Sequence, residues 1–372
     1  MEFDFSQEQY MFQATVRGLL SQHRTMAHLR AGAADAVLWQ VLAETGIFAL
    51  IVPEDAGGMG LGFTDLALVF EEFGRALVPA PVTAAIIGAA LVARHGTAAQ
   101  RAAVLPGLAE GRLRVTLAFA ETTGSVPDAL SLTAMQDGDG WVVRGDKILV
   151  PDAGGADLLI VALRFADGGS GLALIEPGRA GIDLQEQQTL DLAGRWHALR
   201  FDNVRISAGD ILGGAPDPQA VLALFDIGAA ASAIVMTGMA ARMLDEAVDY
   251  VGQRRQFDKV IGSFQAIKHR CADMAVAVDA CRSAAYFAAW ALDEASPAER
   301  ARAVSMAKSW CGDNARFVCN QSIQLHGGVG FTWDLGLHLF LRRVKCEEAA
   351  FGDAHWHRER VLAETLRSIA AE

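Results

Sequence analysis

The hydrophobic repeat of this chain changes twice along its length, and that limits the folds open to it. Apolar residues recur at helical spacing to about residue 112, at strand spacing to about residue 212, and at helical spacing again to the end. Helices and strands bury residues with different periods, so each block indicates one kind of element. The chain is therefore predicted to be an α+β protein. It has an N-terminal helical domain (1–112), a small middle β-barrel or β-sandwich domain (113–212) and a C-terminal four-helix bundle (213–372).

The C-terminal block contains four segments with apolar stripes, which predict an antiparallel bundle. The segments are Leu222–Gln253, Ile261–Leu292, Pro297–Leu325 and Asp334–Glu372, of which the last includes a charged helix. Few charges lie between Asp226 and Arg242 in the first segment. That helix is expected to be buried on more than one side, which favours an oligomer.

Short strand-like runs fill the middle block. Leu130–Met135 and Trp141–Asp146 flank the turn residues Gly138, Asp139 and Gly140, so a β-hairpin is predicted there. Further short strands are predicted at 158–163, 172–175, 182–184 and 199–206. A small all-β domain follows from this spacing.

Composition excludes some functions and favours one compartment. The net charge of −12 argues against nucleic acid, because phosphate backbones require a basic surface. The five cysteines form no Cys-x-x-Cys pair, which is typical of buried thiols in a reducing compartment. The opening residues lack the apolar core of a signal peptide, and no uncharged run is long enough to span a membrane. A soluble cytoplasmic protein is predicted.

A first motif lies at the corner between two predicted bundle helices, in the stretch Gln253–Met274. Its polar residues are Arg255, Gln265, His269 and Arg270. Arginine offers a fixed fork of hydrogen-bond donors, so this face suits a phosphate-bearing ligand. The alternative is a surface helix whose charges are solvated.

A second motif, Gln324–Trp333, ends the third bundle helix and contains the pair Gly327 and Gly328. Paired glycines allow a ligand to approach the backbone closely, but they also end helices in ordinary turns. His326 alone is interpreted as a structural histidine. The glycine-rich stretch 52–62 lacks the Gly-Lys-Ser/Thr of a phosphate-binding loop, so it is interpreted as a tight connector.

Taken together, the two motifs and the three-block plan resemble the acyl-CoA dehydrogenase family over essentially the whole chain. The resemblance implies FAD as cofactor, an acyl-CoA substrate, an electron-transfer partner and a homo- or hetero-oligomer, commonly a tetramer. It also implies that one chain contacts the FAD bound by its neighbour. By this resemblance the cofactor-binding residues are Arg254, Phe257, Gln265, Gln324, Gly327 and Gly328.

The catalytic base of that family has no counterpart here. The family removes the substrate α-proton with a Glu in a Glu-Gly-Thr turn, and the matching turn is Phe351-Gly352-Asp353. A second family location for the base holds Gly228. Nearby Asp226 points elsewhere by helical geometry. No residue meets the requirement that a base reach its proton, so the catalytic residues are left unassigned.

The sequence also departs from the family where a chain contacts its own flavin. The family's Thr-Glu-x-x-x-Gly-Ser-Asp loop is degenerate in the stretch from Ala120 to Asp128. In the strand that normally carries Trp and Thr, Leu149 replaces Trp and Pro151 replaces Thr. Proline has neither a hydroxyl nor a backbone N–H, so a hydrogen bond to flavin is lost.

These losses lead to a hypothesis. The chain is one subunit of a heteromeric acyl-CoA dehydrogenase, similar in arrangement to the heterotetramers of bacterial steroid side-chain breakdown, and its companion brings the base. Two alternatives remain open: a flavin monooxygenase, oxidase or desulfinase on the same fold, and a non-catalytic structural subunit.

Two weaker patterns complete the sequence interpretation. His355 and His357 alternate on a predicted helix and therefore diverge, so no metal site is predicted. The pair Arg342 and Arg343 is predicted to lie on a solvated face or at a subunit contact.

Overall fold

The computed structural model describes residues 5–23, 36–166 and 168–370, and the opening residues 1–4 considered above lie outside it. The predicted α+β plan is confirmed. Helices come first: α1 (Gln7–His23), α3 (Ala36–Glu44), α4 (Phe63–Arg75), α5 (Ala80–His95) and α6 (Ala98–Ala109). Strands follow: β1 (Val115–Ala118), β2 (Thr133–Asp137), β3 (Gly140–Pro151), β4 (Leu158–Phe165), β5 (Ser170–Ile175), β6 (Ile182–Gln187) and β7 (Trp196–Ile206).

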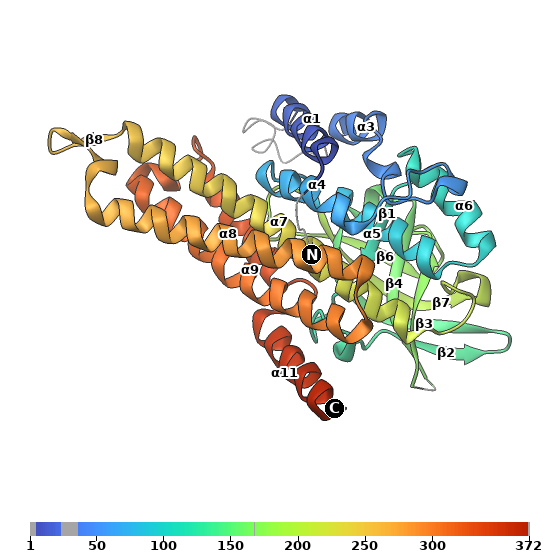
Figure 1. Ribbon diagram of the computed structural model, residues 1–372. Helices are drawn as coiled ribbons and strands as arrows, with labels where there is room; N and C mark the ends of the chain where they lie inside the picture. Colours follow the sequence, from blue (N-terminus) through green and yellow to red (C-terminus); the bar gives the residue numbers. More distant parts are fainter. Residues whose placement is uncertain (1–4, 24–35, 167, 371–372) are drawn as a thin grey trace.

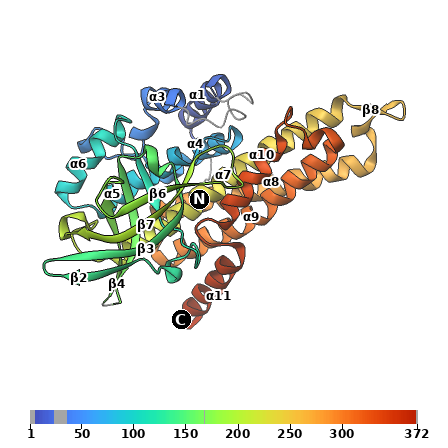
Figure 2. The ribbon, with the colours of Figure 1, turned by 180° about the vertical axis from the view of Figure 1, so that it is seen from behind.

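The C-terminal part is helical again. It contains α7 (Pro218–Gln253), α8 (Gln265–Glu294), α9 (Pro297–His326), α10 (Leu337–Ala349) and α11 (Ala354–Ala370), with a small hairpin of β8 (Arg255–Gln256) and β9 (Lys259–Val260) between α7 and α8. The long helices extend away from the sheet and the N-terminal helices, and the β8–β9 hairpin lies at their far end (Figures 1 and 2).

The seven-stranded sheet has the order β1-β4-β2-β3-β7-β6, with β5 paired to β4. The predicted β2–β3 hairpin is confirmed, with Asp137 opposite Gly140. Strands β1 and β2 both pair with β4 in parallel, which the strand pattern did not predict. Alternation of apolar residues identifies a strand but does not name its partner.

Helix α7 is the central helix of the fold, and every residue from Leu224 to Ala241 on it is buried. It is long and apolar enough to cross a membrane, but 89% of its most apolar window lies inside the fold. Two glycines bring it against α4. A Cβ on Gly74 would lie 2.0 Å from the Val235 carbonyl oxygen, and one on Gly238 would lie 1.9 Å from the Glu71 carbonyl oxygen.

Two predicted helix boundaries were wrong. Ile261–Ser263 forms a 3-10 turn, and α8 begins at Gln265 instead of Ile261. The final helical segment is divided into α10 and α11 by a turn in which Phe351 and Gly352 have φ of 56° and 93°. Such positive φ values are incompatible with a continuous α-helix.

Asp293 joins the end of α8 to the start of α4. Its carboxylate accepts hydrogen bonds from the backbone N–H groups of Phe63 (3.1 Å) and Thr64 (2.9 Å) and from the Thr64 hydroxyl (3.0 Å). Gly62 precedes the helix, and a Cβ there would lie 2.5 Å from the carboxylate. The carboxylate therefore caps a helix N-terminus from another part of the chain.

We expect Asp293→Ala to lower the free energy of unfolding by about 2 kcal/mol, because a cap and charge-assisted hydrogen bonds are lost together. Urea denaturation of both proteins measures the difference. Asp279→Ala on the same helix is the control. Its side chain is 77% exposed in its ion pair with Arg282, so a change below about 0.5 kcal/mol is expected. Equal losses in the two variants would contradict the capping role.

Candidate functional site

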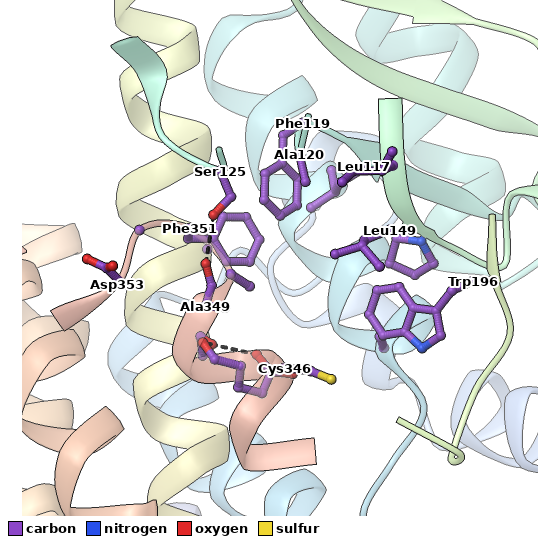
Figure 3. A pocket seen from close by; sticks show the side chains of 18 of the residues that line it. Leu117, Phe119, Ala120, Ser125, Leu149, Trp196, Cys346, Ala349, Phe351 and Asp353 are labelled. Atoms are coloured by element: carbon purple, nitrogen blue, oxygen red, sulfur yellow. Dashed lines mark hydrogen bonds between the residues drawn. The ribbon is translucent and has the colours of Figure 1, made fainter. Parts of the chain in front are cut away.

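A cavity of about 790 Å³ lies where α5, the sheet, α7 and the turn after α10 meet (Figure 3). Its walls are mainly apolar. Helix α5 contributes Ile87, the sheet contributes Leu117, Ile148 and Leu149, and the turn contributes Phe351. Cavities of this size and composition are typical of sites for small organic ligands.

The turn after α10 places an aromatic ring in the cavity wall. Phe351 is 8% exposed, and its ring stacks on Phe119 with centroids 4.1 Å apart and planes 17° apart. Phe225 meets the Phe351 ring edge-on at 6.4 Å. A Cβ on Gly228 would lie 2.2 Å from the same ring. The two positions considered for a catalytic base are 351 and 228. The Phe351 ring occupies the first and fills the space next to the second.

Buried polar groups hold the turn in place. The Lys308 ammonium donates to the carbonyl oxygens of Glu348 and Gly352, both at 2.9 Å. His357 Nε2 lies 2.9 Å from the Phe351 carbonyl oxygen, and Nδ1 lies 3.0 Å from the Ser305 hydroxyl. A carbonyl only accepts, so Nε2 carries the proton and Nδ1 accepts from Ser305. Burial, followed by the charge of Lys308, lowers the pKa of His357 to about 3.

Acidification should therefore destabilise the protein through His357. The unfolded imidazole has a pKa near 6.5, so below that pH the unfolded chain binds a proton that the folded chain excludes. This stability is complete above pH 6.5 and falls as the pH drops toward 3. Between pH 7 and pH 5 we expect a loss of about 2 kcal/mol, measured by urea denaturation at each pH.

His357→Gln should remove most of that loss between pH 7 and pH 5. His355→Gln is the matched control, because His355 is exposed on the same helix. An unchanged pH dependence in His357→Gln would refute the assignment.

The carboxylates that line the cavity all have partners among the described residues. Glu121 accepts from Lys147 at 2.5 Å and from the backbone N–H groups of Ser131 (2.6 Å) and Leu132 (3.1 Å). Burial alone would raise the pKa of Glu121, but Lys147 and these hydrogen bonds lower it below its usual value. Burial lowers the pKa of Lys147 to about 8. The pair fastens β3 to the segment after β1.

A second buried network includes Arg343. Its guanidinium donates to Asp191 at 2.9 Å and to Glu347 at 2.8 Å, and Glu347 also accepts from the Ser232 hydroxyl. Arg343 is 2% exposed, so the prediction that it lies on a solvated face or a subunit contact was wrong. The positions of charged residues along the sequence did not indicate that acidic residues of other elements pair with it.

Cys346 lies beside this network. Burial together with Asp191 raises the pKa of Cys346 to about 11, so it is a thiol at neutral pH.

The remaining acidic residues near the turn are also occupied. Asp353 also lines the cavity, and its Oδ1 accepts from the Trp356 backbone N–H at 2.9 Å. Asp226 pairs with Arg360 at 2.5 Å and lies 4.0 Å from Arg300. Among the described residues, each carboxylate of the cavity wall therefore already accepts a hydrogen bond from the chain itself.

Along the strand wall, the Trp196 Nε1–H is a buried donor without a partner among the described residues, but the backbone of β3 offers little to a ligand. Pro151 has no N–H, and the Leu149 N–H donates to the Gln187 side chain at 2.8 Å. Leu149 has a φ of 52° and lies where the β3–β7 register shifts. The Ser125 hydroxyl donates to the Ala349 carbonyl oxygen at 2.7 Å.

The structure places the predicted cofactor-binding residues at the far end of the long helices, away from the cavity. About 25 residues of α7 separate Gly228 from Gln253, which is roughly 38 Å at the helical rise. Ring stacking of Tyr250 on His326, at 4.4 Å, joins the end of α7 to the end of α9. Both motifs are therefore at one end of the helical layer. The six residues are exposed there: Arg254, Phe257, Gln265, Gln324, Gly327 and Gly328.

The geometry of this end is that of an open surface. Phe257 is 86% exposed at the tip of the β8–β9 hairpin, with a φ of 54°. Gly328 has no neighbouring atom within 4 Å of an added Cβ. Helix α8 begins at Gln265 without a side-chain cap. His326 is buried with Nδ1 2.7 Å from the Ser322 carbonyl oxygen, as expected of a structural histidine.

His357 faces the turn, whereas His355 is exposed, so the two rings diverge. Among the described residues, no group of three or more His, Cys, Asp or Glu is placed to hold a metal ion.

Comparison with known proteins gives consistent results. Residues 6–112 match the acyl-CoA dehydrogenase N-terminal domain, and residues 219–366 match the acyl-CoA dehydrogenase C-terminal domain. The acyl-CoA dehydrogenase IpdE2 of Mycobacterium tuberculosis is 32% identical over 91% of each chain. The probable acyl-CoA dehydrogenase YngJ of Bacillus subtilis is 29% identical over 99% of this chain and all of its own.

Two solved structures extend the comparison. The Tcur3481-Tcur3483 steroid acyl-CoA dehydrogenase variant matches with a TM-score of 0.88 and 30% identity over 98% of this chain and 99% of its own. Butyryl-CoA dehydrogenase from Megasphaera elsdenii has a TM-score of 0.90 at 24% identity over 98% of this chain and all of its own, which shows the shared fold.

Proposed function

Because this chain belongs to the acyl-CoA dehydrogenase family, we propose that it is a subunit of an FAD-dependent acyl-CoA dehydrogenase whose companion chain supplies the catalytic base. The reaction would be the α,β-desaturation of an acyl-CoA thioester, with electrons passed to a separate partner. One observation carries the proposal: the Phe351 ring lies where a base would have to be, and Gly228 leaves room for that ring.

The chain's own cavity fits a flavin ring poorly, because the buried Trp196 Nε1–H is an unpartnered donor there but the other polar groups considered below are missing or already bonded. A flavin ring has carbonyl oxygens and ring nitrogens that need hydrogen-bond partners. Pro151 provides no N–H, and the Leu149 N–H is already bonded to Gln187. Glu121 and Ser125 are likewise bonded within the chain. A buried flavin would leave polar atoms unsatisfied, at about 1–3 kcal/mol for each.

The far end of the long helices does fit the phosphates of FAD. Arg254 brings a guanidinium fork, and Gln265 and Gln324 bring amides. The uncapped N-terminus of α8 presents free backbone N–H groups, which favour an anion. Open space at Gly328 allows the backbone to approach a pyrophosphate.

In this proposal the chain completes a cofactor site centred on its companion. Its own cavity lies roughly 38 Å along α7 from these residues, so they serve a neighbouring chain. FAD supplies the two-electron oxidation when bound. The residues of this chain orient the cofactor's phosphates and close that end of the site, while the companion's carboxylate takes the α-proton.

The same Phe351 geometry favours a second candidate, a structural subunit without any part in turnover. The two candidates differ in one respect: a structural subunit would leave flavin affinity unchanged when Arg254 is altered.

The test is to purify this chain alone and together with any acyl-CoA dehydrogenase chain that is encoded beside it. We expect little flavin and no acyl-CoA dehydrogenation from the chain alone. The co-purified complex should contain fewer flavins than chains and should turn over with an artificial electron acceptor. Full flavin occupancy and dehydrogenation by the lone chain would overturn the proposal.

The variant Phe351→Glu distinguishes two reasons why the lone chain would be inactive: a missing catalytic base and a missing flavin site. If only the base were missing, this change would restore dehydrogenation to the lone chain. Since the flavin contacts are also missing, we expect neither bound flavin nor turnover. Flavin absorbance after gel filtration and an acyl-CoA assay measure both. Recovery of a yellow, active lone chain would contradict the expectation.

A further inference from the structure

We propose that α4 and α8 form a docking surface for an amphipathic helix that carries an arginine, and that α1 is an exchangeable occupant of this surface. The partner that fits the same surface is the α1 helix of a second copy of this chain. The inference goes beyond the proposed function and does not depend on it, because it concerns neither the flavin nor the cavity.

The docking surface is acidic and is made of Asp65, Glu71 and Glu72 of α4 together with Tyr286 of α8. Glu71 and Glu72 are 2% and 1% exposed. Arg282 of α8 donates to Glu71 at 2.9 Å, and the Tyr286 hydroxyl donates to the same carboxylate. In the described part of the chain, the side-chain hydrogen bonds of Glu72 come from α1. A buried carboxylate requires such a partner, so this surface selects a helix that brings a cation.

Helix α1 meets this surface with three long polar side chains spaced four residues apart. Gln9 donates to Asp65 at 2.7 Å, and Gln13 donates to Glu72 at 2.9 Å. Arg17 donates to both oxygens of Glu72, at 2.9 Å from Nε and 2.6 Å from Nη2. Residues at this spacing share one face of a helix, and the paired contact uses the fork of the guanidinium. The structure thus shows the chemistry of the helix that fits.

The rest of α1 is weakly attached to the fold. It lies beside α4 at the outer edge of the molecule (Figures 1 and 2). Its buried residues are Val16 and Leu20, whereas most of α4 is buried. Segments with few buried apolar contacts open locally at a lower free energy than the whole protein. We therefore expect α1 to leave the docking surface while the other helices stay folded.

Helix α1 also carries its own N-terminal cap. The Ser6 hydroxyl accepts from the Gln9 backbone N–H at 3.1 Å, and the Gln9 side chain accepts from the Ser6 backbone N–H at 2.6 Å. A reciprocal cap of this kind favours the helix without help from the rest of the protein. The same helix from a second copy brings an identical set of donors, and exchange of identical elements between copies has a low energetic cost.

Hydrogen exchange of the full chain tests whether α1 opens separately. We expect faster exchange in α1 than in α4 or α7. Arg17→Met removes the guanidinium but keeps helix propensity, so exchange in α1 should become about thirtyfold faster, with α4, α7 and α8 unchanged within about twofold. Thr15→Ala is the control, because the Thr15 hydroxyl bonds only to the Met11 carbonyl oxygen within α1. Its effect should stay below about threefold.

Binding of a second α1 is measured with a fluorescein-labelled synthetic peptide of residues 5–23, by fluorescence anisotropy. The Arg17→Met full chain should bind this peptide at least about tenfold more tightly than the wild-type chain, whose own α1 occupies the surface. A peptide that itself carries Arg17→Met should bind the Arg17→Met chain about thirtyfold more weakly than the wild-type peptide does. Adding Glu72→Gln to the Arg17→Met chain should weaken binding of the wild-type peptide about tenfold.

The remaining outcomes overturn the inference. Unchanged exchange of α1 in Arg17→Met would show that the arginine does not hold the helix. Faster exchange of α4 and α8 together with α1 would make α1 an integral part of the fold. Failure of the Arg17→Met chain to bind the wild-type peptide would exclude a second α1 as partner, and equal binding of both peptides would indicate apolar adsorption. The flavin content of the heteromeric complex is a separate measurement, so the proposed function stands or falls independently.

Discussion

Replacing Arg254 with glutamine is expected to weaken FAD binding by the heteromeric complex about thirtyfold. A guanidinium–phosphate contact is charge-assisted and contributes about 2 kcal/mol, and an amide of similar length keeps hydrogen bonding but loses the charge and the fork. Arg254 is exposed at the far end of α7, so the loss should fall on ligand binding and not on folding. Fluorescence titration of the FAD-free complex measures the Kd.

Arg255→Gln is the matched control for that experiment. Arg255 is the next residue, carries the same charge and is also exposed, but its Nη2 donates to the Asp258 carbonyl oxygen at 3.0 Å within the hairpin. A change below about threefold is expected, since a single exposed charge is screened. Equal effects of the two changes would indicate a general charge effect, and no effect of either would favour the structural-subunit candidate.

Replacing Gly228 with alanine is expected to lower the free energy of unfolding by about 3 kcal/mol. The added Cβ would lie 2.2–2.6 Å from three atoms of the Phe351 ring, which is itself stacked on Phe119. Overpacking of this kind costs about 1–3 kcal/mol, and the ring has little freedom to move because His357 and Lys308 hold its turn. Urea denaturation measures the change.

A double-mutant cycle identifies Phe351 as the cause. Phe351→Ala alone should destabilise by about 3–5 kcal/mol through lost burial and the cavity left behind. In the double variant the two costs should be less than additive by about 2 kcal/mol, because the clash disappears with the ring. Gly252→Ala, on the same helix with no neighbour within 4 Å, should be neutral or stabilise by up to about 1 kcal/mol. Additive effects in the cycle would contradict the contact.

The Arg254→Gln and Gly228→Ala variants test two different parts of the proposed function. Arg254 tests what the chain provides to a neighbour, and the Gly228–Phe351 contact tests why its own cavity lacks a base. A complex that loses FAD affinity in Arg254→Gln while Phe351 and Gly228 show strong coupling would support the division of labour between the two chains.

Element types and the three-part plan followed from the sequence because hydrophobic periodicity is a local property. The change of period near residue 112 and near residue 212 corresponds to the passage from α6 to β1 and from β7 to α7. The two motifs at Arg254 and at Gly327 could also be identified in the sequence, since the family pattern lies in the spacing of residues along the chain. Their role toward FAD stays a prediction.

Contacts between distant elements were decided by the tertiary structure. The predicted start of α8 failed because helical spacing does not reveal a short turn that precedes the helix. The prediction for Arg343 failed because a charge pattern does not show whether acidic residues from other elements will pair with an arginine and bury it. The parallel pairing of β1 with β4 was missed for the same reason.

The sequence by itself determined that residues 228 and 351 are a glycine and a phenylalanine, and so that neither position holds a base. Only the tertiary structure decided that the two residues are in contact. The ring of Phe351 occupies the space that a side chain at position 228 would need. The physical reason is that steric exclusion acts between atoms brought together by packing, and packing joins residues that no local pattern relates.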